Sequence, residues 1–482
     1  MPFTNLGADL SVNNKIHLSG FLKSERSALY LLLFVVLLFR LCLMAMYPLL
    51  DTSEARYGEM ARKMVELGDW VTPMFDYGEP FWGKPPLSFW MQALSISMFG
   101  ESEWALRLPS FLCLCLSCYL LIRWGLEEYC EKSAVLAAII LSSCSLGFVA
   151  FGAVLTDPML SVSLLLALYG FWRAVQYQDN ILALLGFIGL ALGMLAKGPI
   201  ALVLFSVPVF LFLLVNKAWS KLLLLPWLRG LALFFLITMP WYLIAEWKTP
   251  GFWEYFFLGE HIYRFMKPGW SGDLYGNAHL HPRGYIWLYA LVSSLPWCLL
   301  PFFKLRPFGR LAGLFKSSTT LFLVFCTLTP LMFFTLSRNI LWTYVLPALP
   351  LLALLLAVIL VRLAVKFRYL MISAAVIPLA VSLLLADGRK FESWKNQKPI
   401  IQYWQAVKED DDLLYTYQRR IYSAEFYSGG KARQLPSELS SVVGQSFYLI
   451  VRESYSFQER MLQHACELKN TLNGSRIYYC EM

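Results

Sequence analysis

Long apolar runs decide what this chain can fold into. About eleven segments approach the roughly 17 to 25 residues that a helix needs to cross a bilayer. They lie near 28–50, 105–123, 134–154, 157–175, 181–196, 198–215, 229–247, 285–303, 319–336, 341–361 and 369–386. Hydrophobic residues make up 58% of the chain and charged residues only 15%, a balance that excludes an ordinary soluble protein. The sequence therefore predicts a polytopic α-helical membrane protein with about 11 spans.

The excess of positive charge is explained by membrane orientation. The net charge is +9, but Lys and Arg gather in short clusters between apolar runs, as they do in cytoplasmic loops. We expect residues 1–27 to be a cytoplasmic N-terminus and the first span to be retained. Every basic cluster then falls on the cytoplasmic side, provided that the short apolar segment 87–99 does not cross the membrane. We therefore expect 87–99 to be re-entrant or interfacial, and we expect no nucleic-acid partner.

The connections on the opposite face carry polar residues that the apolar runs lack. These connections are 51–104, 155–158, 196–199, 248–284 and 337–344. The first is expected to contain interfacial helices, and 248–284 is the second large external loop. Charges gathered on one membrane face favour an enzyme whose site opens to that side. A transporter or lipid flippase is the alternative from another class, but it predicts inverted repeats and charges near the bilayer midplane.

The C-terminal segment 387–482 has a mixed polar composition and is expected to form a small external α/β domain. Its candidate elements are helices at 397–409 and 456–470 and strands at 412–417, 446–451 and 475–480. Cys466 and Cys480 are plausible disulfide partners, because an external domain permits oxidation. Most of the other cysteines lie in apolar runs without the spacing of metal ligands, where cysteine is usually a small packing residue.

The stretch SEARYGEMARKMVELGDW, residues 53–70, follows the first apolar run. Apolar residues recur at helical spacing, Ser53 is a candidate N-cap, and Gly68 is a candidate terminator. We expect a helix in the membrane interface. Its charged residues are expected to form a solvated face: Glu59, Arg62, Lys63 and Glu66. The residues at the start of this stretch are better candidates for chemistry, because they stand where the first span ends.

Several motifs in order resemble one family. They are DTSEARYGEMARKMVELGDWVTPMFDYGEPFWGKPPLSFW, FGESEWALRLPS, LTDPMLS, LAKGPIAL, PWYLIAEWKTPGFWEYFFLGEHIYRF and YVLPALPLLALLLA. Together they resemble the polyprenyl-phosphate-sugar-dependent glycosyltransferases, a C-type superfamily that includes the aminoarabinose transferase of lipid A and the protein O-mannosyltransferases. The resemblance covers roughly residues 30–360 and implies that 28–386 is a transmembrane glycosyltransferase domain.

The resemblance also implies catalytic acids at the first loop. The family has an acidic pair, one further residue and then Arg-Tyr; Arg56 and Tyr57 match, Glu54 matches the second acid, and Ser53 stands in place of the first. A carboxylate that accepts the proton of the attacking hydroxyl suits this chemistry. Glu54 is therefore the expected base, with Asp51 as its alternative.

Negative charge grows on the lipid phosphate as the sugar leaves, so the chemistry needs fixed cations. By the resemblance, the residues expected to bind the donor phosphate are Arg56, Tyr57, Lys84, Lys197, His261, Arg264 and Tyr344. Asp157, which precedes Pro158 at the mouth of a span, is expected among the catalytic residues, where it would orient a cation or help hold a metal. Arg338 is a candidate replacement for a lysine that the family has near Tyr344.

Simpler roles stay open for several of these residues. Lys84 and Lys197 could place their charges at the membrane surface from the ends of spans. Arg264 could pair with Glu260 four residues earlier on a helix. His261 could be structural, and Tyr344 could be an aromatic anchor at the membrane interface.

A divalent metal cofactor is weakly indicated. Lipid A transferases have an acidic residue directly before the lysine that corresponds to Lys84, and this chain has Gly83 there. The metal ligands are therefore unknown.

The resemblance implies transfer of a sugar from an undecaprenyl-phosphate-linked donor, with inversion, in a bacterial inner membrane and on its periplasmic face. The expected acceptor is lipid A, lipopolysaccharide or another envelope glycan, and protein O-mannosylation is the enzymatic alternative. A catalytically inactive relative that only binds lipid is a third reading, since fold alone does not assure function. The motifs do not identify the sugar.

Overall fold

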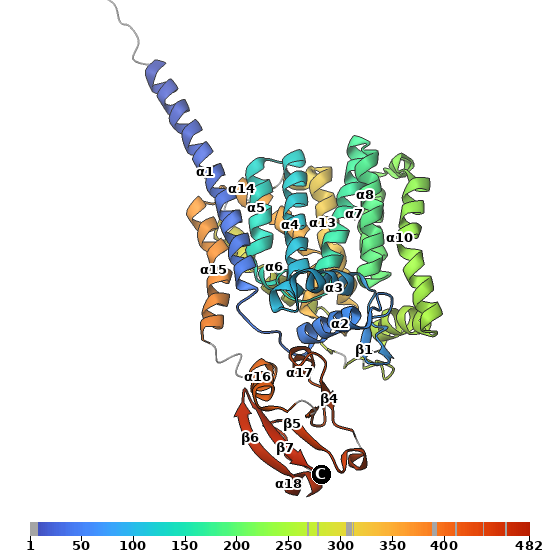
Figure 1. Cartoon of the computed structure of the whole chain (residues 1–482). Helices are drawn as coiled ribbons and strands as arrows, with labels where there is room; N and C mark the ends of the chain where they lie inside the picture. Colours follow the sequence, from blue (N-terminus) through green and yellow to red (C-terminus); the bar gives the residue numbers. More distant parts are fainter. Residues whose placement is uncertain are drawn as a thin grey trace, which may run out of the picture.

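Long helices stand side by side in a bundle, and a small domain lies at one end of it (Figure 1). The structure is a computed structural model that describes residues 8–267, 269–276, 279–304, 311, 313–387, 393–409, 412–436, 438–457 and 460–482. The helices of the bundle are α1 (Ala8–Leu43), α4 (Glu103–Glu128), α5 (Glu131–Ser143), α6 (Ser145–Ala150), α7 (Asp157–Tyr177), α8 (Asn180–Lys197), α9 (Ile200–Asn216), α10 (Trp227–Lys248), α12 (Tyr285–Ser293), α13 (Ser318–Thr335), α14 (Leu349–Arg362) and α15 (Phe367–Ala386).

Seven of the described helices are long and apolar enough to cross a membrane: α4, α7, α8, α10, α13, α15 and, in α1, residues 25–43. Each apolar run found in the sequence is helical, which confirms the polytopic α-helical class. Some runs are interrupted, however. The run at 285–303 ends as α12 at Ser293 and resumes as the short helix η3 (Trp297–Lys304), with Pro296 between them. Proline has no backbone N–H to continue a helix, so a break is expected there.

Shorter elements lie on the connections. They are α2 (Ser53–Leu67), β1 (Met74–Asp76), β2 (Glu79–Pro80), α3 (Leu87–Phe99), η1 (Trp219–Leu224), the π-helix η2 (Glu254–Tyr263), α11 (Arg264–Met266), η5 (Leu314–Lys316) and η6 (Trp342–Val345). Helices α2 and α3 run across the end of the bundle that faces the small domain (Figure 1). Helix α3 has 13 residues, too few to span a bilayer, which agrees with the expectation for 87–99.

The C-terminal domain is an α/β fold. Its elements are α16 (Lys398–Val407), β3 (Leu413–Thr416), α17 (Tyr422–Tyr427), β4 (Ala432–Gln434), η8 (Leu439–Val442), β5 (Ser446–Arg452), α18 (Arg460–Ala465), β6 (Cys466–Leu472) and β7 (Ser475–Glu481). The strands form one sheet in the order β4-β3-β5-β7-β6. Strand β3 runs parallel to β4 and β5, whereas β7 runs antiparallel to β5 and β6. The predicted strands and the first predicted helix of this segment are confirmed within one or two residues at each end.

The predicted helix at 456–470 is wrong in its second half. The described helix there ends at Ala465, and Cys466–Leu472 is a strand that pairs with β7. The turn between the two strands is Asn473-Gly474, both with positive φ. Asn-Gly between alternating residues is a strong hairpin signal that the helical spacing of 456–470 obscured.

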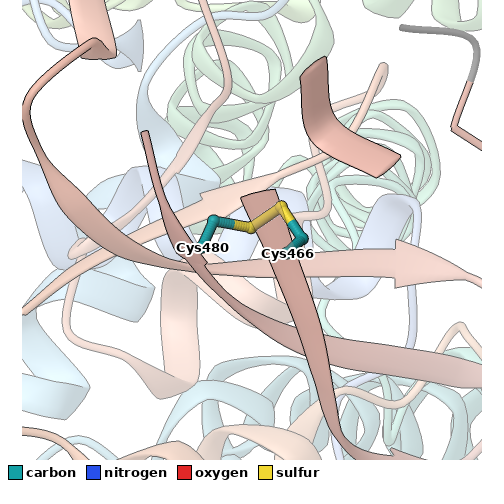
Figure 2. The surroundings of a disulfide bond; sticks show 2 residues. All are labelled: Cys466 and Cys480. Atoms are coloured by element: carbon teal, nitrogen blue, oxygen red, sulfur yellow. A yellow bond between two sulfur atoms is a disulfide. The ribbon is translucent and has the colours of Figure 1, made fainter. Parts of the chain in front are cut away.

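Cys466 and Cys480 form the disulfide that the sequence predicts, and it joins β6 to β7 (Figure 2). The two residues are opposite each other in the strand register, and their Cα atoms lie 4.0 Å apart. The disulfide therefore closes the hairpin at the end away from its turn.

The charged face of α2 is not solvated, contrary to the expectation. Glu59, Arg62 and Lys63 expose only 1%, 4% and 1% of their surface; Glu66 alone among the four is exposed, as expected. The C-terminal domain covers this face, because α17 packs against α2. Gly68 ends α2 in the left-handed conformation as predicted, but Ser53 is the first helical residue rather than the N-cap.

Candidate functional site

Most of the cations that the sequence singles out line one pocket of about 170 Å³. Its polar lining comes from segments far apart in the chain: Lys84, Lys197, Glu260, His261, Arg264, Ser337, Asn339 and Tyr344. Apolar residues complete the lining: Pro199, Ile200, Val203, Phe265, Phe333 and Phe334. A cationic pocket with an apolar wall suits a ligand that has an anionic head and a hydrocarbon chain.

Lys197 and Asp157 form an ion pair at the edge of this pocket. Lys197 is the last residue of α8 and Asp157 the first of α7, so close packing of these two helices aligns the pair. Gly170 permits that packing, because a Cβ there would lie 2.4 Å from the carbonyl oxygen of Leu182. The Tyr344 ring lies 4.5 Å from Lys197 Nζ. The pair and the ring hold the ammonium group at the pocket.

Glu260 organises the other two cations. Its carboxylate accepts two hydrogen bonds of 2.8 Å from Arg264, and one of its oxygens lies 3.6 Å from Lys84 Nζ. Although burial opposes ionisation, Lys84 and Arg264 lower the pKa of Glu260 from its ordinary value. Arg264 also pairs with Asp273 at 3.1 Å. The sequence predicts Glu260 only as a partner of Arg264, but its spacing from His261 and Arg264 also places it on the same side of the helix as these two residues of the pocket.

His261 is held by the backbone. Its Nδ1 lies 2.8 Å from the carbonyl oxygen of Phe256 and its Nε2 lies 3.1 Å from that of Lys197. Burial lowers the pKa of His261, and a neutral imidazole donates to only one of these oxygens. Both ring nitrogens therefore face main-chain acceptors and not a metal.

The residues around the pocket do not fit a divalent metal. Such an ion needs several carboxylate or imidazole ligands, and the described residues contain no group of three His, Cys, Asp or Glu that could hold one. Gly83 offers no side chain, and a Cβ there would lie 2.9 Å from the Phe81 ring. We therefore derive no step of the chemistry through a metal.

The structure separates the two first-loop acids from this pocket. Both oxygens of Glu54 accept hydrogen bonds from the buried Arg107, at 2.7 and 2.8 Å, and Oε1 also accepts one from the backbone of Val154. Asp51 accepts hydrogen bonds from the C-terminal domain, at Tyr422 and Ser423. Neither carboxylate lines the pocket, so the role of Glu54 or Asp51 as a base stays a hypothesis without a supporting contact.

Arg56 and Tyr57 lie next to the pocket rather than in its wall. Tyr57 is within electrostatic reach of Lys197, and its ring meets Phe89 edge to face. Arg56 donates a 2.7 Å hydrogen bond to the carbonyl oxygen of Tyr275. Arg338, the candidate replacement cation, is exposed and does not line the pocket.

Comparison with known proteins agrees with this architecture. Residues 27–256 match the family model described as dolichyl-phosphate-mannose-protein mannosyltransferase. The undecaprenyl phosphate-α-4-amino-4-deoxy-L-arabinose arabinosyl transferase of Erwinia tasmaniensis is 32% identical over 342 residues, which cover 70% of this chain and 60% of that protein. The chain thus spans about 60% of the length of this relative.

Solved structures share the fold. ArnT from Cupriavidus metallidurans, bound to undecaprenyl phosphate, superposes with a TM-score of 0.77 at 18% identity, over 94% of this chain and 98% of that one. The archaeal oligosaccharyltransferase AglB from Archaeoglobus fulgidus superposes with a TM-score of 0.55 at 12% identity, over 88% and 69% of the two chains.

The chain shares the fold of the ArnT structure. The resemblance to the polyprenyl-phosphate-sugar-dependent glycosyltransferases is confirmed by the family model and by the relative from Erwinia tasmaniensis. The chain is a multi-pass protein of a bacterial inner membrane.

Proposed function

We propose that this protein is an integral-membrane glycosyltransferase that takes a sugar from an undecaprenyl-phosphate-linked donor. The observation that carries the proposal is the convergence of Lys84, Lys197 and Arg264 on one pocket with an apolar wall. The names of the relatives support the same donor class. Residues 28–386 form the transferase domain in this proposal, and 387–482 form a periplasmic domain.

The three cations bind the donor phosphate. As the bond between the sugar and the phosphate breaks, the phosphate gains a negative charge, and preorganised cations stabilise that change more than they stabilise the ground state. Asp157 orients Lys197, and Glu260 orients Arg264 and Lys84. The sugar is transferred in one displacement with inversion, as in the family that the chain resembles.

The acceptor is a phosphate group of lipid A or of another envelope glycolipid. A hydroxyl acceptor needs a base, yet the carboxylates found at the pocket are poor bases: Glu260 has a lowered pKa and Asp157 is paired with Lys197. A phosphate oxygen is already ionised near neutral pH, because its second pKa is about 6. This argument favours an anionic glycolipid over protein hydroxyls, the acceptors of protein O-mannosyltransferases.

A flippase or transporter is less well supported. Its substrate site would be expected near the bilayer midplane between broken helices. Lys197 and its partner Asp157 instead lie at helix ends, and Lys84, Glu260 and Arg264 lie on the connections between the long helices.

Transfer is tested with purified protein in detergent, undecaprenyl-phosphate-linked aminoarabinose and lipid A. Mass spectrometry of the lipid A is expected to show an added aminopentose, and Lys197→Met is expected to abolish it. Comparison of envelope lipids with and without the protein tests the same proposal for other sugars. No added sugar on any envelope lipid would contradict the proposal.

The orientation is tested with two cysteines. Glu79 lies in the first loop and is exposed, and native Cys130 lies in the connection between α4 and α5, on the opposite face by the predicted topology. In intact spheroplasts, a membrane-impermeant maleimide should label Glu79→Cys but not Cys130, and permeabilised cells should show labelling of both. Labelling of Cys130 alone in intact spheroplasts would reverse the topology.

A further inference from the structure

Helix α17 of the C-terminal domain packs directly on α2 (Figure 1). Asp51, which precedes α2, accepts hydrogen bonds of 3.0 and 3.1 Å from the backbone N–H groups of Tyr422 and Ser423. The first loop therefore holds the start of α17 in place, and with it the side chain of Tyr422.

Ion pairs, of which Lys63–Glu425 is buried and Arg420–Glu425 largely buried, hold the same interface a few residues away. Lys63 of α2 lies 3.4 Å from Glu425 of α17, and Arg420 pairs both with Glu425 and, at 3.2 Å, with Asp76 of the first loop. Buried pairs of this kind specify one geometry, because any other arrangement leaves an unpaired charge. The C-terminal domain is thus docked in a defined position.

In that position Tyr422 meets Arg56. The Arg56 guanidinium lies 5.2 Å from the ring centroid of Tyr57 and 6.0 Å from that of Tyr422. Tyr57 in turn lies within electrostatic reach of Lys197 at the pocket. Ring contacts at Arg56 and an electrostatic interaction at Tyr57 therefore connect the C-terminal domain with the ion pair of the pocket.

Arg56 lacks a countercharge among the residues that the structure describes. No carboxylate of the described residues pairs with it, and its Nε has no hydrogen-bond partner although the atom is buried. A half-buried cation without an anion is costly. Donor phosphate would bind in the pocket, whose lining does not include Arg56. The Arg56 guanidinium is therefore available to an anionic group of the acceptor lipid.

On the basis of the proposed transferase activity, we propose that Arg56 binds the anionic group of the acceptor lipid and that Tyr422 is the residue that positions it. The C-terminal domain thereby completes the acceptor side of the site. Tyr422 does not touch the reacting atoms; it acts through Arg56.

Kinetics separate this role from a general structural one. We compare Tyr422→Ala, Tyr422→Phe and the control Tyr479→Ala, which removes a tyrosine of β7 that packs on Tyr448 of the same sheet. Tyr422→Ala is expected to raise KM for lipid A about tenfold, the cost of one cation–π contact, while the Kd of undecaprenyl phosphate stays within about twofold. Tyr422→Phe keeps the ring and should recover most of the loss. Equal losses of donor and acceptor binding would overturn the proposal.

Chemical labelling gives a readout that does not depend on transfer. Phenylglyoxal, which modifies accessible arginines, should react several-fold faster with Arg56 in Tyr422→Ala than in the wild type or in Tyr479→Ala, as measured by peptide mass spectrometry. Unchanged reactivity of Arg56 would overturn the positioning role even if transfer occurs. If the wild type transfers no sugar but Arg56 still reacts faster in Tyr422→Ala than in the wild type, only the proposed function is overturned.

Loss of docking is checked by limited proteolysis. If Tyr422→Ala releases the C-terminal domain, Tyr422→Leu replaces it in the kinetic comparison, because leucine keeps apolar bulk against Phe75 but has no aromatic face for the cation. Wild-type values of KM for lipid A in a docked Tyr422→Leu protein would overturn the proposal.

Discussion

Glu54 is held by Arg107 through both carboxylate oxygens, at 2.7 and 2.8 Å, and Arg107 is completely buried. Arg107 also donates to the carbonyl oxygens of Met44, Tyr47 and Pro48. The residue that the motif marks as a base thus joins the end of the first span to α4.

Glu54→Gln should therefore destabilise the protein. It leaves the charge of Arg107 buried without a carboxylate, a change that costs about 3 to 5 kcal/mol in comparable sites. Thermal unfolding in detergent measures the loss. Glu54→Gln combined with Arg107→Met should recover part of it, since no charge is then left unpaired. Wild-type stability of Glu54→Gln together with lost transfer would instead support a role for Glu54 in the chemistry.

Lys84→Ala should weaken binding of undecaprenyl phosphate about tenfold, because one of the proposed phosphate cations is removed while Lys197 and Arg264 stay. Titration of the purified protein with the lipid measures this effect. Lys248→Ala is the matched control, because Lys248 pairs with Asp69 outside the pocket. Equal affinities of wild type and Lys84→Ala would remove Lys84 from the phosphate site.

Lys197→Met should lower kcat more than Asp157→Asn does. Loss of the Lys197 charge removes stabilisation of the leaving phosphate and should lower kcat about 100-fold or more. Asp157→Asn keeps the ammonium but loosens it, so a smaller loss is expected. Transfer assays with saturating donor test this order, and the reverse order would make Asp157 the more direct participant.

Docking of the C-terminal domain should depend on pH through Asp51. Burial raises the pKa of Asp51 from 3.8 to about 6, although hydrogen bonds from Ser423 and Tyr422 oppose the shift. Because Asp51 binds its proton more tightly in the folded than in the unfolded protein, the proton stabilises the fold. This stabilisation is complete below the unfolded pKa and is lost as the pH rises through about 6. The thermal midpoint of wild type relative to Asp51→Asn should therefore fall between about pH 4 and pH 7. A difference that does not change with pH would contradict this prediction.

Removal of the disulfide should destabilise the C-terminal domain. Cys466 and Cys480 are 14 residues apart, and closing a loop of about 15 residues contributes about 3 kcal/mol in the chain-entropy view. Cys466→Ser with Cys480→Ser should lower the midpoint of unfolding of this domain and speed its proteolysis. Oxidised and reduced wild type provide the same comparison without a substitution.

The spans, the C-terminal α/β domain, the disulfide and the three pocket cations Lys84, Lys197 and Arg264 were predictable from the sequence alone. Span length is imposed by the bilayer, and alternation in strands is a local pattern, so both are written in short segments of sequence. Lys84, Lys197, Arg264 and Tyr344 were found because ordered motifs resemble a family. Local pattern also explains why the helix predicted at 456–470 is wrong in its second half, since these residues have helical spacing although a hairpin turn follows at Asn473-Gly474.

Only the tertiary structure decided what the charges contact. The charged face of α2 looks solvated in the sequence, because nothing local shows that α17 covers it from more than 350 residues away, as the 362-residue separation of Lys63 and Glu425 illustrates. In the same way, Glu54 looks like a free carboxylate until Arg107 is brought against it, and Glu260 looks like a surface partner until Lys84 approaches. A charge has its role set by its burial and its nearest opposite charge, and both depend on segments that folding brings together.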